Sequence, residues 1–216
     1  MKKNLIVLSI IIVVGVGFYF GYQYSSRKKA EIGDASHLQT PANQLAEVDK
    51  PNKDGTTVLM NAAYSGNIDT VQRLLDKGAT VNAKNKFEMT PLINAVSRPY
   101  SSGNAIEVVK LLIKNGADVN SKTKEGWTAL HGAVQGEQTE AAIYLLENGA
   151  EIDSQYTLTG ETPLMMATER VNKVLMQALL TKGADVNAKD KWGKGVISYA
   201  HGRPDLVEML KQAGAK

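Results

Sequence analysis

Apolar residues recur along the chain in a pattern that predicts pairs of short helices. In the clearest stretch, Leu164 and Ala167 are three residues apart, so both lie on one face of a helix that begins at Pro163. Thr162 precedes this helix, and its hydroxyl can accept a hydrogen bond from a free backbone N–H of the first turn. A second apolar run ends before Gly183, a residue type that adopts the left-handed backbone with which helices commonly stop. The stretch therefore predicts two helices followed by an extended turn.

The same unit is repeated over most of the chain. Its start, a threonine with a leucine two residues later, occurs at Thr57, Thr90, Thr128 and Thr162 and in degenerate form at Gly195, at spacings of 33, 38, 34 and 33 residues. A Gly-Ala stop recurs at positions 78, 116, 149, 183 and 214. Two independent markers that stay in register five times predict a repeat protein.

A period near 33 residues with a Thr-Pro-Leu-His-x-Ala start is typical of ankyrin repeats, and residues 51–216 resemble that family. Repeat 3 follows the family pattern most fully, with Gly126, Thr128, Leu130, His131 and Ala133. The resemblance implies an all-α solenoid, an ankyrin-repeat array of about five helix–turn–helix repeats with hairpin turns. It also implies a non-catalytic scaffold for protein–protein interaction, in which His131 is structural. The approximate repeats are 52–84, 85–122, 123–156, 157–189 and 190–216.

Three repeats depart from the pattern. In repeat 2, Glu88 stands where the family has glycine, so we expect that turn to differ, and residues 97–102 lengthen the loop between the two helices. Repeat 4 has one extra residue in the turn at 154–161. Repeat 5 begins at Gly195 without a capping threonine, and its first helix is expected to be short.

Residues 4–26 form an uncharged run of 23 residues with an apolar centre from Leu5 to Phe20. About 20 apolar residues suffice for a helix to cross a bilayer. Aromatic residues cluster at 18–24, as they would in an interfacial belt. Residues 1–26 are therefore predicted to form a transmembrane helix that precedes the array.

The alternative for this segment is a cleaved signal peptide, with Lys2 and Lys3 before the apolar core and a poor small-residue cleavage site at 15–17. A short basic N-terminus before the first apolar run resembles a signal-anchor. We therefore expect a single-pass membrane protein with its repeats outside the cytoplasm, on the periplasmic side if the source is bacterial. Cleavage would make it secreted or periplasmic. Residues 27–50 are predicted to be a linker, either a solvated tether or one containing a helix from Thr40 that caps the first repeat.

The sequence offers no catalytic constellation. The chain has no cysteine, which excludes disulfides, thiolate nucleophiles and cysteine metal ligands. Its three histidines, at 37, 131 and 201, lack the spacing of a metal site. Gly193-Lys194-Gly195 lacks the serine or threonine that follows the lysine of a phosphate-binding loop. We therefore interpret the protein as a non-enzyme, without a cofactor, a metal or a small-molecule substrate.

The turns between repeats carry the candidate binding residues. Each holds an aromatic side chain, although aromatic residues are only 6% of the chain, and lysines stand beside three of them. Large aromatic residues are enriched among the anchors of protein interfaces, and lysines suit an acidic partner. The predicted partner-binding residues are Lys86, Phe87, Met89, Lys124, Trp127, Tyr156, Lys191, Trp192 and Lys194. In the alternative, one or two of these rings pack onto a neighbouring turn.

Charge narrows the class of partner. Residues 51–216 contain 19 lysines and arginines against 18 aspartates and glutamates, a net charge of +1. A nucleic-acid binder would carry a basic face, so the expected partner is another protein. Two functions remain open: an interaction scaffold tethered to a membrane, or an inhibitor, immunity-type or accessory protein that binds and regulates an enzyme outside the cytoplasm.

Overall fold

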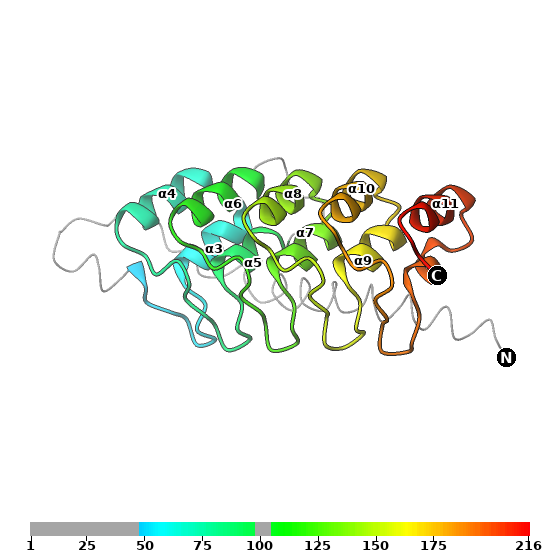
Figure 1. Cartoon of the computed structure of the whole chain (residues 1–216). Helices are drawn as coiled ribbons and strands as arrows, with labels where there is room; N and C mark the ends of the chain where they lie inside the picture. The colour runs from blue at the N-terminus through cyan, green and yellow to red at the C-terminus, as the bar shows by residue number, and fades with distance from the viewer. Residues whose placement is uncertain (1–47, 98–104) are drawn as a thin grey trace. The chain divides into compact units, whose positions relative to one another are not determined.

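A computed structural model describes residues 48–97 and 105–216, which form a stack of helix pairs (Figure 1). The described residues contain helices and turns but no strand, which confirms the all-helical repeat architecture. In chain order the pairs are α3 (Val58–Ser65) with α4 (Ile68–Asp76), α5 (Pro91–Ala95) with α6 (Ala105–Lys114), α7 (Ala129–Gln135) with α8 (Thr139–Glu147), α9 (Pro163–Glu169) with α10 (Lys173–Thr181), and the 3-10 helix η2 (Val196–Ala200) with α11 (Pro204–Gln212).

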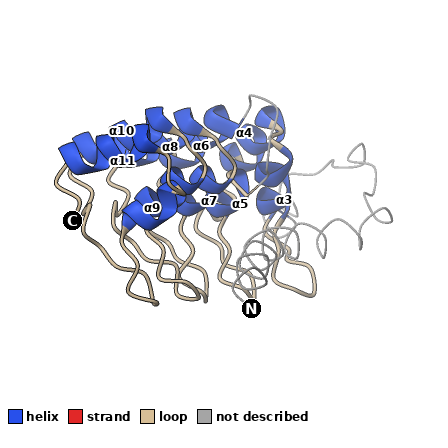
Figure 2. Cartoon of the chain, turned by 90° about the vertical axis from the view of Figure 1, so that its right-hand side faces the viewer, coloured by secondary structure: helices blue, strands red, loops and turns tan. Residues whose placement is uncertain are grey.

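The repeats form two rows of helices and one row of loops. The second helices of the pairs (α4, α6, α8, α10 and α11) lie side by side along one edge, and the first helices form the row beneath them (Figures 1 and 2). Long hairpin loops connect each repeat to the next. They project from the edge opposite the second helices (Figure 2). The loops therefore present a row of tips that is separate from the second helices.

Threonine caps explain where the first helices begin. In repeats 1 to 4 the hydroxyl of the threonine accepts a hydrogen bond from the backbone N–H three residues later, at 3.2, 3.3, 3.4 and 3.4 Å. Gly195 has no side chain to do this, and the first helix of repeat 5 is a 3-10 helix. The expectation of a shortened helix is confirmed.

The core is continuous along the stack because each repeat buries its apolar face against the next. Leu130 in α7 and Leu164 in α9 are 0% and 1% exposed, and Leu145 and Leu175 of the second helices are also buried. Leu130 therefore lies between layers of helix.

The hairpin at Glu88 has the same backbone hydrogen bonds as those at Gly55, Gly126 and Gly193, contrary to the expectation that it would differ. A residue in left-handed conformation stands at the same place in every hairpin, and in repeat 2 it is Glu88, with φ 62°. The flanking Lys84 ammonium lies 3.0 Å from the Glu88 carboxylate. The neighbouring repeats impose the turn on a residue type that does not favour it. The equivalent residues are Gly55, Gly126, Gly160 and Gly193, with φ of 79°, 76°, 76° and 73°.

A line of asparagine and aspartate side chains, which we call the polar ladder, joins consecutive repeats. Asn82 donates from Nδ2 to the Gly116 carbonyl at 2.9 Å and accepts from the Asp118 N–H at 2.8 Å. Asp153 has no amide group and makes one such bond, accepting from the Asp185 N–H at 2.9 Å. The rungs are Asp49, Asn82, Asn120, Asp153 and Asn187.

The first rung bears on where the array starts. Asp49 accepts from the backbone N–H of Thr80 at 2.9 and 3.0 Å, and Val48 beside it is 8% exposed. Asp49 thus bonds the next repeat as Asn82 does, and residues 48 and 49 of the predicted linker lie on the array.

Several expectations concern residues outside the described ranges. These are the transmembrane helix or signal sequence at 1–26, the rest of the linker up to residue 47, and most of the long loop of repeat 2. Of the helices within 48–97 and 105–216, none has both the length and the apolar character needed to span a membrane.

Candidate protein-interaction surface

The hairpin tips are shaped by a polar side chain that binds the backbone of its own turn. In repeat 2, Asn85 Oδ1 accepts the N–H groups of Phe87 and Met89 at 2.9 and 3.0 Å. In repeat 5, Asp190 Oδ1 accepts the N–H groups of the residues at the same two places, Trp192 and Lys194, both at 2.8 Å. Phe87 and Trp192 therefore occupy equivalent positions three repeats apart, each directly before the left-handed residue.

Backbone hydrogen bonds fasten the tips to one another. The Lys86 N–H donates to the Asp54 carbonyl at 2.9 Å, and the Lys191 N–H donates to the Thr159 carbonyl at 3.0 Å. The tips are numbered 1 to 5 by the left-handed residue that each contains, which is Gly55, Glu88, Gly126, Gly160 or Gly193 in turn. Similar bonds join tip 2 to tip 3 at 3.4 Å and tip 3 to tip 4 at 2.9 Å. The row of tips is consequently an ordered surface, on which side chains of successive repeats keep a fixed register.

Three apolar side chains are exposed on this row of tips. Trp192 is 64% exposed, Leu158 51% and Phe87 39%. A lysine ammonium lies over each of the two rings, 5.1 Å from the centroid of Phe87 and 5.9 Å from that of Trp192. Large apolar groups at these fractions are available to a partner, and the Lys194 ammonium beside Trp192 is placed to meet opposite charge.

The other two aromatic residues of the turns pack inside the array. Tyr156 is 7% exposed, and its ring meets that of Trp127 edge-on with centroids 4.8 Å apart. Trp127 is partly buried and stacks on His131 at 5.3 Å. Met89, in the same turn position as Trp127, also packs against the core. For these three residues the structure favours the packing alternative, and burial removes Tyr156 from the contact surface.

His131 supports this cluster from below. Its Nδ1 accepts the Thr128 N–H at 3.2 Å, so the ring proton is on Nε2, which faces the backbone of the next hairpin near Ser154 and Glu161. Complete burial lowers the pKa of His131 to about 4, although those two backbone neighbours act in the opposite direction. The residue is neutral at physiological pH and has the structural role that the family resemblance implies.

A buried polar cluster at the last two tips was not found from the sequence. Tyr199 donates its hydroxyl to Asp190 Oδ2 at 2.8 Å, and Thr159 donates to Glu161 Oε2 at 3.0 Å. Burial raises the pKa of Glu161 and that of Tyr199. One sequence feature could have indicated this cluster: Asp190 stands in repeat 5 at the position that Asn52 and Asn85 occupy in repeats 1 and 2.

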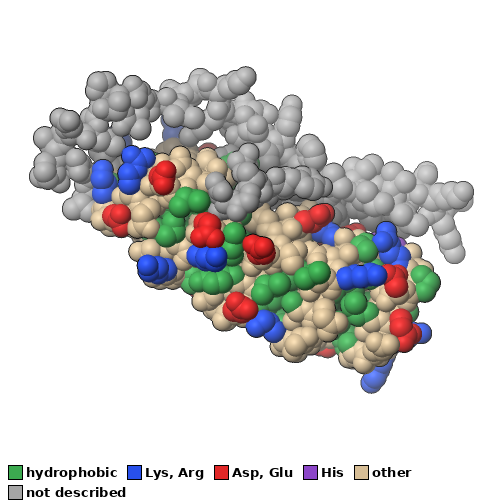
Figure 3. Space-filling view, turned by 90° about the horizontal axis from the view of Figure 1, so that it is seen from above, with side chains coloured by type: hydrophobic (Ala, Val, Ile, Leu, Met, Phe, Trp, Pro, Cys, Tyr) green, Lys and Arg blue, Asp and Glu red, His purple; other side chains and the backbone are tan. Residues whose placement is uncertain are grey.

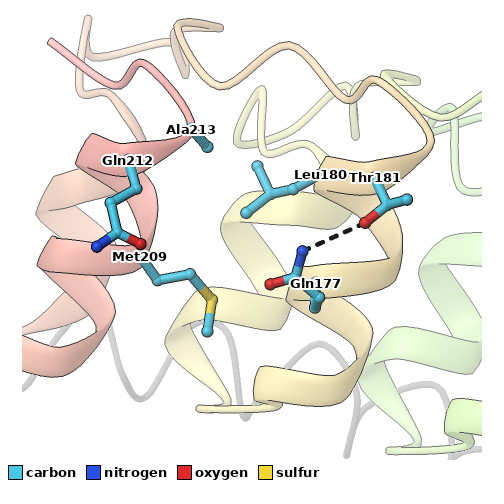
Figure 4. A pocket seen from close by; sticks show the side chains of 6 residues that line it. All are labelled: Gln177, Leu180, Thr181, Met209, Gln212 and Ala213. Carbon is cyan, nitrogen blue, oxygen red and sulfur yellow. Dashed lines mark hydrogen bonds between the residues drawn. The ribbon is translucent and has the colours of Figure 1, made fainter.

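Nothing in the described residues suggests catalysis. They hold no group of three histidine, cysteine or acidic side chains placed to bind a metal. A depression of about 260 Å³ lies between α10 and α11 (Figure 4), where Gln177 donates to Thr181 at 3.2 Å. No titratable side chain lines it; its residues are Gln177, Leu180, Thr181, Met209, Gln212 and Ala213.

The face formed by the second helices lacks a charge preference. Lysine and arginine side chains are interspersed there with acidic and apolar ones (Figure 3). The uncovered part of this face in Figure 3 shows no concentration of one charge that would select a charged partner. The hairpin tips, with their exposed rings and lysines, are therefore the stronger candidate for an interface.

Stacked helix pairs with projecting hairpins define a class of solenoid protein that binds partners through an extended surface. A family model for ankyrin repeats, described as "Ankyrin repeats (3 copies)", matches residues 31–123, 59–156 and 100–190. The chain belongs to the ankyrin-repeat family. This relationship indicates a scaffold for protein–protein interaction.

Several named proteins are similar in sequence to parts of this chain. The chain is 41% identical over 92 residues to the B-cell lymphoma 3 protein homolog of Mus musculus, covering 42% of this chain and 20% of that protein. It is 36% identical over 84 residues to ankyrin repeat and SOCS box protein 6 of Homo sapiens, covering 38% and 20%. A Danio rerio protein with the name "Putative palmitoyltransferase ZDHHC13" is 32% identical over 174 residues, covering 78% of this chain and 26% of that protein. The chain thus matches about a quarter or less of the length of these relatives.

Proposed function

We propose that this protein is a non-catalytic interaction scaffold that binds another protein through its row of hairpin tips. The observation that carries the proposal is the pair Phe87 and Trp192, which are exposed and held in equivalent turns by the same kind of polar side chain. A backbone that is fixed in this way loses little conformational freedom on binding, which favours affinity. The contact residues are Lys86, Phe87, Lys124, Lys191, Trp192 and Lys194, while Met89, Trp127 and Tyr156 support the turns from within.

A protein is the partner that best suits this surface. Phenylalanine and tryptophan are side chains that anchor protein interfaces, and lysines at the rim steer and orient acidic groups. The near-neutral charge of residues 51–216, +1, argues against a nucleic-acid partner. The row of tips also extends over several repeats, as is suited to an extended protein segment.

A membrane tether is part of the proposal. Its support is the 23-residue uncharged run at 4–26, which is long enough to cross a bilayer. Extraction with alkaline carbonate and N-terminal sequencing of the mature chain test this element. A chain that begins at Phe18 or later would replace the tether by a secreted or periplasmic protein.

The second use of the same surface is regulation of an enzyme outside the cytoplasm, as an inhibitor, immunity-type or accessory protein. The two uses differ in what happens to a bound partner. If the partner is an enzyme whose turnover changes when the array is added, the regulatory function is favoured; unchanged turnover favours a scaffold.

Site-specific photo-crosslinking in the full-length chain tests the binding surface. A photoreactive amino acid replaces Trp192 or Phe87 in separate variants, and Val174 in a control, because Val174 on α10 is as exposed as Trp192, 64% in each case. Val174 belongs to the row of second helices, whereas the hairpins project from the opposite edge (Figure 1). We expect the same partner band from both tip positions and none from position 174. Equal crosslinking from position 174, or none from the tips, would remove the tips from the interface.

A further inference from the structure

Lysines on the tips differ in whether a carboxylate neutralises them. In repeat 2 the Lys86 ammonium lies 2.6 Å from Asp54, and Lys84 lies 3.0 Å from Glu88. At the base of tip 3, Lys122 lies 2.6 Å from Glu151. The charge of these three lysines is already compensated, so they offer little to an incoming anion.

The last tip is different. Lys189, Lys191 and Lys194 are exposed, and among the described residues none of them has an ion-pair partner within 4.0 Å. The Lys189 ammonium extends over Gly195, where it would be 2.9 Å from an added Cβ, so it lies close to the start of η2. Three positive charges thus border one turn.

The acidic residues of tips 4 and 5 face inward. Asp190 is 6% exposed, and both of its oxygens are used, one by its own turn and the other by the Tyr199 hydroxyl. Glu161 is 7% exposed and accepts from Thr159. The sequence suggests a mixed charge for these two tips, but their surface is positive because folding buries the carboxylates and leaves the ammonium groups outside.

Apolar surface lies beside these charges. Trp192 and Leu158 are the two most exposed apolar side chains on the tips, at 64% and 51%. Thr159, next to Leu158, is bonded through its carbonyl to the N–H of Lys191, next to Trp192, at 3.0 Å. The two apolar side chains therefore belong to adjoining tips that are fastened together.

From this combination we infer that tips 4 and 5 form a docking surface for an acidic protein segment that carries large apolar residues. We call it the C-terminal tip surface, comprising Leu158, Lys189, Lys191, Trp192 and Lys194. The inference rests on the proposed function and adds where on the row of tips the partner is held and what chemistry holds it. Carboxylates of the segment meet the three ammonium groups, and its apolar side chains cover Trp192 and Leu158.

The occupant is a protein segment rather than a single-stranded nucleic acid. Binding of single strands relies on successive bases stacking on several aromatic rings along a positively charged groove. The C-terminal tip surface has one exposed ring, and residues 51–216 have a net charge of only +1. Leucine at position 158 offers apolar area without a face for stacking.

The test uses the full chain with three short fluorescent probes of equal length. One alternates glutamate with leucine, the second alternates lysine with leucine, and the third is oligouridine. Fluorescence anisotropy should detect binding of the acidic peptide, and affinity should fall with added salt. The lysine peptide and oligouridine should bind at least about tenfold more weakly, a difference of roughly 1.4 kcal/mol. Tighter binding of oligouridine would overturn the inference, as would equal binding of both peptides.

Matched variants locate the binding. Replacing Lys189, Lys191 and Lys194 together by glutamine should weaken binding of the acidic peptide about tenfold or more. The control replaces three other lysines by glutamine, those at 84, 110 and 122, which are ion-paired in the array. This control should bind within about twofold of the unsubstituted chain, because its charges were already compensated. Equal losses in the two triple variants would refute a surface confined to tips 4 and 5.

The crosslinked partner separates failure of this inference from failure of the proposed function. If Phe87→Ala weakens binding of that partner but the triple substitution at 189, 191 and 194 does not, the tips bind elsewhere and only the inference fails. If neither change affects the partner, the proposed function fails with it. A blue shift of Trp192 emission on addition of the acidic peptide, measured in a Trp127→Phe background, would support direct contact with the ring.

Discussion

The hydroxyl of Tyr199 donates a 2.8 Å hydrogen bond to the carboxylate of Asp190, and this bond ties η2 to the last hairpin. The other carboxylate oxygen accepts the N–H groups of Trp192 and Lys194. Burial of the ring and its bond to Asp190 raise the pKa of Tyr199, so the phenol remains a donor at every physiological pH. In a repeat that lacks a capping threonine, Asp190 thus organises the turn and holds the following helix to it through Tyr199.

Asp190→Ala should destabilise the array, whereas Asp190→Asn should be tolerated. Alanine leaves three donors without their acceptor in a site where Asp190 is 6% exposed, at about 1–3 kcal/mol for each group that is not rescued by water. Asparagine keeps an oxygen for the turn, as Asn85 does in repeat 2. Urea unfolding curves of the two variants measure the difference, and equal stability of both would show that the bonds contribute little.

Glu88→Gly should stabilise the protein by about 1 kcal/mol. Glu88 has φ 62°, a conformation that glycine adopts without the steric penalty of a Cβ. The lost ion pair with Lys84 is surface-exposed and contributes little. Glu125→Gly, one residue before the left-handed position of the next hairpin, is the control and should be neutral or destabilising. A lower midpoint of urea unfolding for Glu88→Gly than for the unsubstituted chain would contradict the backbone assignment.

Stability should decrease on acidification because of His131. Its folded pKa is about 4, below the usual value of 6.5, so the unfolded chain binds a proton more readily between these two values. The contribution is fully present above pH 6.5 and is lost as the pH falls toward 4, by an amount of about 3 kcal/mol. His131→Gln keeps a side chain that can complete the capping box with Thr128, and it should flatten this part of the stability–pH curve. An unchanged slope in the variant would assign the pH dependence to other groups.

Leu130→Ala should cost about 2–5 kcal/mol, since Leu130 is 0% exposed between helix layers. Leu158→Ala is the same chemical change at a side chain that is 51% exposed, and it should alter stability by no more than about 0.5 kcal/mol. Chemical denaturation of both variants decides the matter. A small effect at Leu130 would mean that the layers do not meet at this residue.

Removing the exposed rings should affect binding but not folding. The double variant Phe87→Ala, Trp192→Ala should keep its melting temperature within about 2 °C while losing roughly thirtyfold or more in affinity for the crosslinked partner. Trp127→Ala is the contrasting variant, because that ring packs on His131 and Tyr156 and its loss should lower the melting temperature. Should the double variant melt early and bind normally once folded, the rings are structural.

The sequence predicts the helix pairs well because their signals are local. A threonine cap and a Gly-Ala stop act within one turn of the chain, and Thr162 and Gly183 stand in the structure where these signals place them. Glu88 was mispredicted because its conformation is dictated by the neighbouring repeats rather than by its own preference.

Which rings face outward could not be read from composition. Trp192 directly precedes the left-handed residue of its hairpin and points into solvent, whereas Trp127 directly follows it and turns toward the core. Tyr156 meets Trp127 from the next repeat, where an extra residue changes the turn, so the contact depends on both hairpins. The buried state of Asp190 likewise depends on Tyr199, which lies beyond its own turn.

When the array is pulled from its two ends, the rungs of the polar ladder bear the force one after another, because each rung joins only consecutive repeats. The rung at Asn82 has two hydrogen bonds, but Asp153, which cannot donate, holds the fourth helix pair to the third by one. A pulling force applied at the two ends therefore meets the weakest rung of this ladder in the interior, between the third and fourth helix pairs.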